Sequence, residues 1–143
     1  MIYIGLDVGT SGCKAAVVDA SGTVSAFASR EYSLVFPASG YAELNPDTVW
    51  SAVKDVLNKI APKAKNAKAI AVSSIGESMV ILDDNDQPLT NGITYLDQRC
   101  KHVVSEIAKV ITPQALSDIT LVPLNQMFSL NKLIWYKNNQ PSV

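Results

Sequence analysis

The N-terminal segment of the chain places a carboxylate and a short glycine-containing turn between two apolar stretches. Asp7 directly follows the first apolar stretch, and a second apolar run comes after the turn. This pattern predicts two antiparallel strands, Ile2–Asp7 and Cys13–Asp19, joined by a tight turn, with a third strand from Thr23 to Tyr32. Short connections between successive strands indicate an antiparallel meander at the start of the fold.

The turn after the first strand contains residues that suit a metal-bound polyphosphate. Asp7 at the strand end could hold the shell of a Mg²⁺ ion, directly or through water. The N–H groups of a loop starting at Gly9 and the hydroxyls of Thr10 and Ser11 could bond phosphate oxygens, with Lys14 adding a positive charge. The G-x-x-x-x-G-K-[ST] phosphate-loop pattern is absent, and this turn leads into a strand rather than a helix. The alternative, a hairpin in which the glycines only permit the turn, stays open on these residues alone.

The remainder of the chain mixes helical and extended segments. A helix is expected to begin at Pro46, with Asn45 as its cap, and to end before Pro62. Residues 67–73 form a short apolar segment of the kind that is buried on both faces of a sheet. Residues 88–96 are expected to be extended. Further helices are predicted over residues 97–110, 112–119 and 129–138. This order of elements indicates an α/β chain with a mixed sheet.

Composition argues against several classes of function. The formal net charge is −1 and no run of Lys or Arg occurs, so nucleic-acid binding has little support. Cys13 and Cys100 form no C-x-x-C pair and are expected as buried thiols of a reducing compartment. His102, the only histidine, cannot build a histidine-based metal site and is expected on a helix surface. No secretory signal and no apolar stretch approaching about 20 residues is present, so we expect a cytoplasmic protein without a membrane partner.

Two polar clusters interrupt the later apolar pattern. Glu77, flanked by Ser74 and Ser78, could accept hydrogen bonds from the vicinal hydroxyls of a substrate. The alternative for this segment is an ordinary loop with an exposed glutamate. In the second cluster, Asp97 is expected to cap the helix that follows, and Arg99 to pair with Asp97 or with another carboxylate.

Three aromatic residues each have two interpretations. Tyr95 could line a sugar face or could simply pack at the end of a strand. Trp50 and Trp135 lie at helical spacing with aliphatic residues. That spacing favours a place in the core over a role as a ligand platform.

Taken together, five segments of the chain resemble the FGGY carbohydrate kinases, a family that includes glycerol kinase, xylulokinase and gluconokinase. The segments are residues 4–14 (IGLDVGTSGCK), 40–46 (GYAELNP) with Trp50 after them, 72–78 (VSSIGES), 95–99 (YLDQR) and 123–135 (PLNQMFSLNKLIW). The resemblance implies an α/β, ribonuclease H-like fold of the actin, Hsp70 and hexokinase superfamily. We therefore expect a mixed five-stranded sheet with flanking helices, incomplete in this chain.

The resemblance also implies roles for the N-terminal residues. Asp7 matches the aspartate that orders Mg²⁺ and its waters. The loop that begins at Gly9, with Thr10 and Ser11, matches the loop that faces the ATP phosphates. Lys14 falls where family members place a lysine or an arginine. ATP and Mg²⁺ are the cofactors expected on this basis.

On the substrate side, the resemblance comes with departures from known family members. Glu77 falls where glycerol kinase has a glutamate that binds substrate hydroxyls and where xylulokinase has a histidine. Gly76 replaces an arginine of glycerol kinase, Tyr95 replaces a tryptophan that often lines the substrate, and Met127 replaces a substrate-contacting tyrosine. Asp97 completes the set of expected substrate-side residues. The loss of the arginine and the tyrosine argues against glycerol, and Glu77 in place of the histidine argues against a plain xylulokinase pocket. A sugar such as a ketose, another polyol or a sugar acid is left as the expected small-molecule partner.

Family members have two actin-like domains, and the resemblance covers only the beginning of the first. Residues 1–143 are therefore expected to be the N-terminal portion of FGGY domain I, without the rest of domain I and without domain II. The base aspartate is expected beyond Val143, so no catalytic residue is assigned within this chain, and the chain alone is expected to be inactive. The full-length protein is expected to phosphorylate a sugar, polyol or sugar acid with ATP, and a homodimer is among the assemblies expected for it. The alternative is a degenerate, non-catalytic sugar-binding relative.

Overall fold

A computed structural model describes all residues of the chain, 1–143. The chain divides into two compact units. The first, here called the sheet unit, contains Met1–Leu34 and Leu44–Gly76. The second, the helical unit, contains Val35–Glu43 and Glu77–Val143. The helical unit is therefore built from one short excursion of the chain and its whole C-terminal half.

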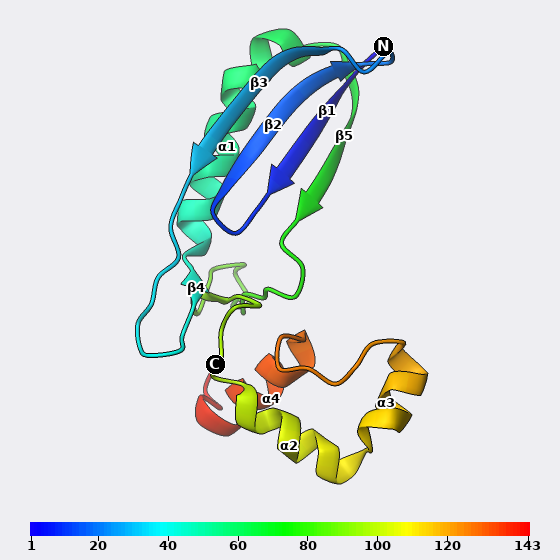
Figure 1. Ribbon diagram of the computed structural model, residues 1–143. Coiled ribbons are helices and arrows are strands. Elements are labelled where there is room, and N and C mark those ends of the chain that lie inside the picture. Colours follow the sequence, from blue (N-terminus) through cyan, green and yellow to red (C-terminus); the bar gives the residue numbers. More distant parts are fainter. The chain divides into compact units, whose positions relative to one another are not determined.

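The sheet unit contains a mixed sheet of four strands in the order β3-β2-β1-β5 (Figure 1). The strands are β1 (Ile2–Val8), β2 (Gly12–Asp19), β3 (Val24–Glu31) and β5 (Ala67–Ser74). The pairs β1–β2 and β2–β3 are antiparallel, as the meander prediction requires, whereas β5 runs parallel to β1. The α/β class and the mixed sheet are confirmed, but the sheet has four strands rather than the five expected.

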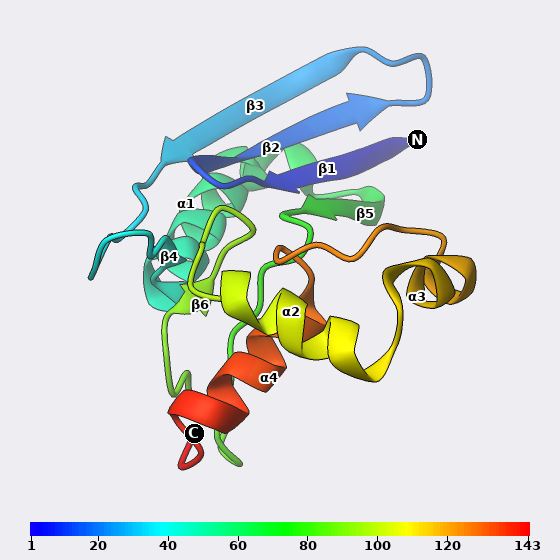
Figure 2. The same ribbon diagram turned by 60° about the horizontal axis from the view of Figure 1, so that its bottom comes forward.

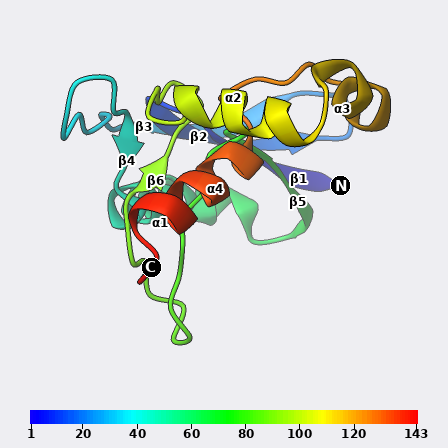
Figure 3. The same cartoon turned by 90° about the horizontal axis from the view of Figure 1, so that it is seen from below.

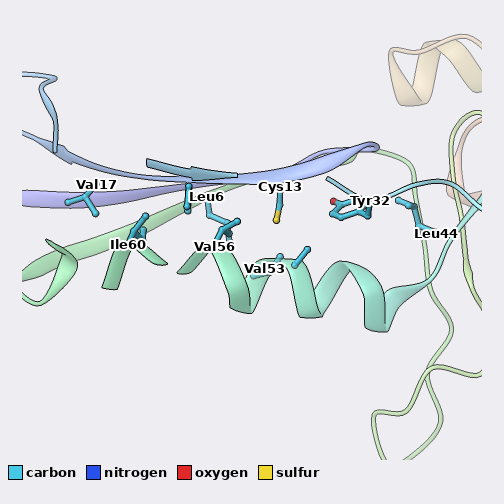
Figure 4. Close-up of a cluster of buried hydrophobic side chains, with 11 residues drawn as sticks. Leu6, Cys13, Val17, Tyr32, Leu44, Val53, Val56 and Ile60 are labelled. Atoms are coloured by element: carbon cyan, nitrogen blue, oxygen red, sulfur yellow. The ribbon is translucent and has the colours of Figure 1, made fainter. Parts of the chain in front are cut away.

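One face of this sheet is covered by α1 (Pro46–Ala64). Asn45 caps the helix as predicted, because its side chain accepts a hydrogen bond from the Thr48 N–H at 2.9 Å. Alternate residues of β2 point toward the helix and pack against its apolar stripe (Figure 4). The core of the unit includes Leu6, Cys13, Ala15, Val17, Ala52, Val53, Val56 and Ile60.

The helix end differs from the prediction, because α1 continues through Pro62 to Ala64. A proline removes one backbone hydrogen bond and crowds the preceding turn, which ends most helices. Pro62 lies in the last turn of α1 and is exposed, so the carbonyl that loses its partner is near the helix end, where such groups reach water.

Two expectations of burial in the sheet unit are also wrong. Strand β5 is an edge strand, and its residues 68–74 are exposed, with Val72 at 61%. Trp50 on α1 is 59% exposed rather than part of the core, and Lys54 Nζ lies 5.9 Å from the centre of its ring. An apolar run and an apolar helical spacing indicate a preference for burial, but neither says whether this chain supplies a covering layer.

The helical unit consists of short strands and three helices (Figure 2). Strand β4 (Glu43–Leu44) begins in this unit and pairs with β6 (Gly92–Ile93), the only strand formed in the segment 88–96. The helices are α2 (Lys101–Val110), α3 (Pro113–Thr120) and α4 (Ser129–Asn139). Helices α2 and α4 lie side by side (Figure 3), and their core contains Val103, Ile107, Trp135 and Tyr136. Trp135 is thus in the core, as expected.

The helix starts in this unit test the capping predictions. Thr112 caps α3, which was predicted over residues 112–119, and accepts from the Ala115 N–H at 3.2 Å. Helix α4 matches its predicted bounds closely. Helix α2 begins at Lys101 rather than near Asp97, and its N-cap, Cys100, makes no capping side-chain hydrogen bond. The predicted capping role of Asp97 is therefore wrong, because its carboxylate is used elsewhere in the unit.

Both cysteines are free and buried, and His102 is exposed on α2, as expected. None of the helices is long and apolar enough to cross a membrane.

Candidate functional site

The first group of candidate residues lies at the end of β1 in the sheet unit. Asp7 on β1 and Lys14 on β2 are directly opposite each other in the antiparallel register. Directly opposed residues share a face of the sheet. Their neighbours Leu6, Cys13 and Ala15 are buried against α1, so alternation along the strands places Asp7 and Lys14 on the other, exposed face. Neither side chain forms an ion pair or a hydrogen bond within the protein, which leaves both free for a ligand.

The loop between β1 and β2 is held by its own backbone and by Tyr32. The Gly9 N–H donates to the Gly12 carbonyl at 2.9 Å, and the Tyr32 hydroxyl donates to the Gly9 carbonyl at 2.7 Å. The Tyr32 N–H donates to the Ser11 carbonyl at 3.1 Å. Burial raises the pKa of Tyr32 to about 12, so this hydroxyl keeps its proton at any ordinary pH. The N–H groups of Thr10 and Ser11 make no hydrogen bond within the protein.

The glycines of the loop have a more specific requirement than turn formation. Neither Gly9 nor Gly12 has a positive φ angle. A Cβ atom on Gly12 would lie 2.8 Å from the Arg30 carbonyl oxygen and 3.1 Å from the Glu31 Cα. Gly12 is therefore required by the close approach of β3, which brings Arg30 and Glu31 to the rim of the loop.

A hollow of about 230 Å³ lies at this loop. It is lined by Asp7, Gly9, Ser11, Gly12, Cys13, Lys14, Ser29, Arg30 and Glu31. Four of the five predicted phosphate-side residues thus share one concavity, and Thr10 lies in the same loop without lining it. A second, shallower hollow of about 430 Å³ on the sheet also includes Asp7 and Lys14.

The carboxylates of the chain fit only one mode of metal binding. No group of three or more His, Cys, Asp or Glu side chains converges anywhere in the chain. Mg²⁺ commonly keeps several waters and is held by one or two carboxylates together with substrate phosphates. The free carboxylate of Asp7 suits this mode and does not suit a metal held by protein ligands alone.

The second group of candidate residues lies in the helical unit, around the start of α4. Glu77 is half-buried, with a left-handed backbone conformation at φ 54°. Its carboxylate accepts hydrogen bonds from the Ser129 N–H at 2.8 Å and from the Ser129 hydroxyl at 3.0 Å. Glu77 thus supplies the acceptor that Phe128, the N-cap residue of α4, lacks. Glu77 is therefore not the exposed loop glutamate of the alternative interpretation.

Met127 is connected to Glu77 through a lysine. Lys132 Nζ donates to the carbonyl oxygens of both Glu77 and Met127. The Met127 N–H donates to the Asn125 side chain at 3.0 Å. Gly76 is the last residue of the sheet unit, and a Cβ atom there would meet nothing within 4 Å. The local backbone therefore does not require a glycine at position 76.

Asp97 belongs to a buried charged cluster. It is 2% exposed and accepts from the Ala42 N–H at 2.7 Å and from the Arg99 N–H at 2.9 Å. Arg99 also donates to Asp97 through Nε and Nη2, and to Glu43 at 2.5 Å. The predicted pairing of Arg99 with Asp97 is confirmed, and the second carboxylate is Glu43. The guanidinium carbon lies 3.8 Å from the centre of the Tyr41 ring.

Electrostatics in this cluster favour the ion pairs. Burial alone would lower the pKa of Arg99, but hydrogen bonds to Asp97 and Glu43 outweigh burial and raise that pKa. Tyr95, two residues before Asp97, is 39% exposed, and its hydroxyl makes no hydrogen bond. Tyr95 is thus a substrate-side candidate that is free in the structure, whereas the oxygens of Asp97 are already occupied.

Sequence reasoning missed four residues that hold these sites: Tyr32, Glu43, Ser129 and Lys132. Each makes a hydrogen bond to a residue far away in the sequence, so no local pattern indicates its role. The sequence contained one signal, because these polar residues lie in or beside apolar segments. A polar residue that is buried there must find a hydrogen-bond partner.

Comparisons with known proteins agree on one family. Residues 2–143 match the FGGY family of carbohydrate kinases, N-terminal domain. A probable L-xylulose kinase of Haemophilus influenzae is 32% identical over 98% of this chain and 30% of its own length. A xylulose kinase of Staphylococcus xylosus is 31% identical over 96% of this chain and 29% of its own length.

Solved structures give the same result. The xylulose kinase of Rhodospirillum rubrum superposes with a TM-score of 0.94 at 30% identity, over 99% of this chain and 30% of that one. The gluconate kinase of Lactobacillus acidophilus superposes with a TM-score of 0.87 at 29% identity, over 99% of this chain and 29% of that one. These neighbours confirm the actin-like ATPase fold. The chain spans about 30% of the length of the relatives it matches. It belongs to the FGGY family of carbohydrate kinases.

Proposed function

We propose that the full-length protein transfers the γ-phosphoryl group of ATP to a hydroxyl of a sugar, polyol or sugar acid. The observation that carries this proposal is the exposed pair Asp7 and Lys14, opposed on two strands and without protein partners, at the loop hollow of a carbohydrate-kinase family member. Functional carboxylates and lysines that are left unpaired beside a concavity are available to a charged ligand.

Residues 1–143 are the N-terminal portion of domain I in this proposal, and the rest of that domain and domain II come from chain beyond Val143. The general base and the adenine site lie there, so this portion supplies no catalytic residue and has no kinase activity alone. It contributes the phosphate loop and part of the sugar pocket. The free, buried state of both cysteines agrees with a cytoplasmic location. A homodimer of the full-length protein is part of the same proposal.

On the phosphate side, each residue of the loop has a distinct task. Asp7 holds Mg²⁺ through its waters, and Lys14 faces the phosphate charge from the neighbouring strand. Thr10 and Ser11 offer hydroxyls and free N–H groups to phosphate oxygens, whereas the Gly9 N–H is already bonded within the loop and shapes the turn. When bound, Mg²⁺ neutralises charge that develops on the transferred phosphoryl group.

On the substrate side, Glu77 and Tyr95 are the direct contacts in this proposal, with Met127 as an apolar wall. A carboxylate has about four acceptor positions, so the two hydrogen bonds from Ser129 leave Glu77 able to accept from substrate hydroxyls. Gly76 leaves open space that a bulkier substrate can use. Asp97 acts by fixing the segment that carries Tyr95. Ketoses, larger polyols and aldonates fit this arrangement better than glycerol.

The test is ADP release by the full-length protein against a panel of ketoses, polyols and aldonates, with thermal shift as a parallel measure of binding. We expect at least one compound to accelerate ADP release, and Asp7→Asn to lower that rate by roughly 10²–10³-fold with unchanged unfolding temperature. Asp47→Asn, an exposed carboxylate in α1, is the matched control and should behave as wild type. A panel in which nothing is phosphorylated would favour the degenerate relative.

A further inference from the structure

Lys132 is a buried cation that forms no ion pair. It lies on the first turn of α4 and is 1% exposed. No carboxylate is within ion-pair distance of its Nζ. Burial lowers its pKa, and the charged and titratable groups around it are Cys100, Glu77 and Asp97. Taking an ammonium group out of water without pairing it is unfavourable, so its retention needs a reason other than packing.

The hydrogen bonds of Lys132 give that reason. Its Nζ donates to the carbonyl oxygens of Glu77 and Met127, which are 55 and 5 residues away in the sequence. Both are predicted substrate-side residues. Glu77 has a left-handed backbone at φ 54°, a conformation that persists in a non-glycine residue only when surrounding contacts hold it.

The other contacts of these two residues come from the same part of the chain. Ser129, the first residue of α4, holds the Glu77 carboxylate through two hydrogen bonds. The Asn131 side chain donates to the Asn125 carbonyl at 2.9 Å, in the turn that contains Met127. Lys132 is the side chain that bonds the backbones of both Glu77 and Met127, and together with the Glu77–Ser129 hydrogen bonds it holds Glu77 in place relative to Met127.

We propose that Lys132 is a positioning residue for the substrate side of the pocket, which it sets by holding the backbones of Glu77 and Met127 in one arrangement. It does not itself contact the substrate. The proposal rests on the proposed function, because it assumes that these two residues meet the sugar. Small displacements of substrate-contacting groups change turnover strongly even when the altered residue is remote from the chemistry.

The experiment compares Lys132→Met, Lys132→Arg and Lys137→Met in the full-length protein. Methionine keeps the unbranched apolar part of the side chain without the charge or the donors, and arginine keeps the charge and the donors. Lys137, exposed near the end of α4 and free of hydrogen bonds, is the matched control. The measurements are kcat and KM for the best sugar and for ATP, with hydrogen exchange of peptides covering residues 75–79 and 125–129.

We expect Lys132→Met to raise the sugar KM about tenfold or more, to leave the KM for ATP unchanged, and to speed exchange in both peptides. Lys132→Arg should recover part of each change, and Lys137→Met should match wild type. A purely structural role would lower apparent kcat through loss of folded protein and leave the sugar KM as it was, which would overturn the proposal.

Two further results of this experiment have different consequences for the two proposals. If the wild-type protein phosphorylates no sugar, the proposed function fails, and the exchange data still decide whether Lys132 fixes the two segments. If Lys132→Met does not fold, Lys132→Gln replaces it in both measurements, because glutamine has no charge and its side chain is one atom shorter than that of lysine. Wild-type sugar KM and wild-type exchange in the glutamine variant would then count against the proposal.

Discussion

The sheet unit and the helical unit use their polar residues in opposite ways. In the sheet unit, Asp7 and Lys14 are exposed and have no partner within the protein. In the helical unit, Asp97 and Lys132 are almost fully buried, and each makes several hydrogen bonds. A change to the first pair should therefore affect ligand binding alone, whereas a change to the second should affect folding as well.

The difference follows from what each group has to do. A carboxylate that is to bind a metal and a phosphate must have no partner within the protein. Because such a carboxylate is exposed to water, it keeps its hydration when the chain folds. The shape of a sugar pocket depends instead on the fixed relative positions of segments that are far apart in sequence. Buried hydrogen-bonded charges can fix such positions, at the cost of coupling the site to the stability of the unit.

The largest expected effect on stability tests the buried half of this comparison. Replacing Arg99 by methionine leaves Asp97 and Glu43 without their shared cation in a buried cluster. Breaking a buried pair in this way costs about 3–5 kcal/mol of unfolding free energy. Urea unfolding of the protein measures it, with Lys14→Met in the sheet unit as the matched control, expected to unfold as wild type. An Arg99→Met protein as stable as the control would mean that the cluster is not a stabilising element.

The next prediction tests whether the sheet unit is constrained by its backbone rather than by its side chains. Gly12→Ala forces a Cβ atom against the Arg30 carbonyl and the Glu31 Cα, so it should lower stability by about 1–3 kcal/mol. Gly5→Ala is the matched control, since a Cβ atom there meets nothing within 4 Å. The urea midpoints of the two variants give the comparison, and equal midpoints would contradict it.

Much of the sheet unit could be predicted from sequence because its signals are local. The three strands of the meander follow from alternation and short turns, and the start of α1 follows from Asn45 and Pro46. Such features depend on residues within about one turn or one strand of each other. Lys14 was expected only to add a positive charge near this turn, and the structure places it directly opposite Asp7.

The predictions that were wrong concern residues whose surroundings in the fold cannot be inferred from the neighbouring sequence. Asp97 has the residue type and position of a helix cap, yet its carboxylate bonds to Ala42, 55 residues earlier. Strand β5 and Trp50 have apolar patterns typical of burial, but within this chain no layer covers them. The site of Lys132 could not be predicted for the same reason, because Glu77 lies 55 residues away from it.

The smallest expected effect compares the two buried thiols, Cys13 in the sheet unit and Cys100 in the helical unit. Burial raises the pKa of both, and it raises the pKa of Cys100 to about 11, with Asp97 adding to the effect. Arg30 works against the shift at Cys13. Carboxylates and cations act on both thiols, burial is the largest cause at each, and the larger shift is that of Cys100 in the helical unit.

Since the folded-state pKa of Cys100 exceeds its ordinary value of 9.0, the unfolded chain loses the thiol proton first as pH rises. The contribution of Cys100 to stability is therefore fully present below pH 9 and is lost as pH approaches 11, by roughly 1–2 kcal/mol. Urea midpoints at pH 8 and pH 10.5 should fall less in Cys100→Ala than in wild type, and Cys13→Ala should reduce the fall by a smaller amount. An equal reduction by both variants would mean that the two thiols have the same electrostatic surroundings, and the contrast between the units would then be limited to the residues at their candidate sites.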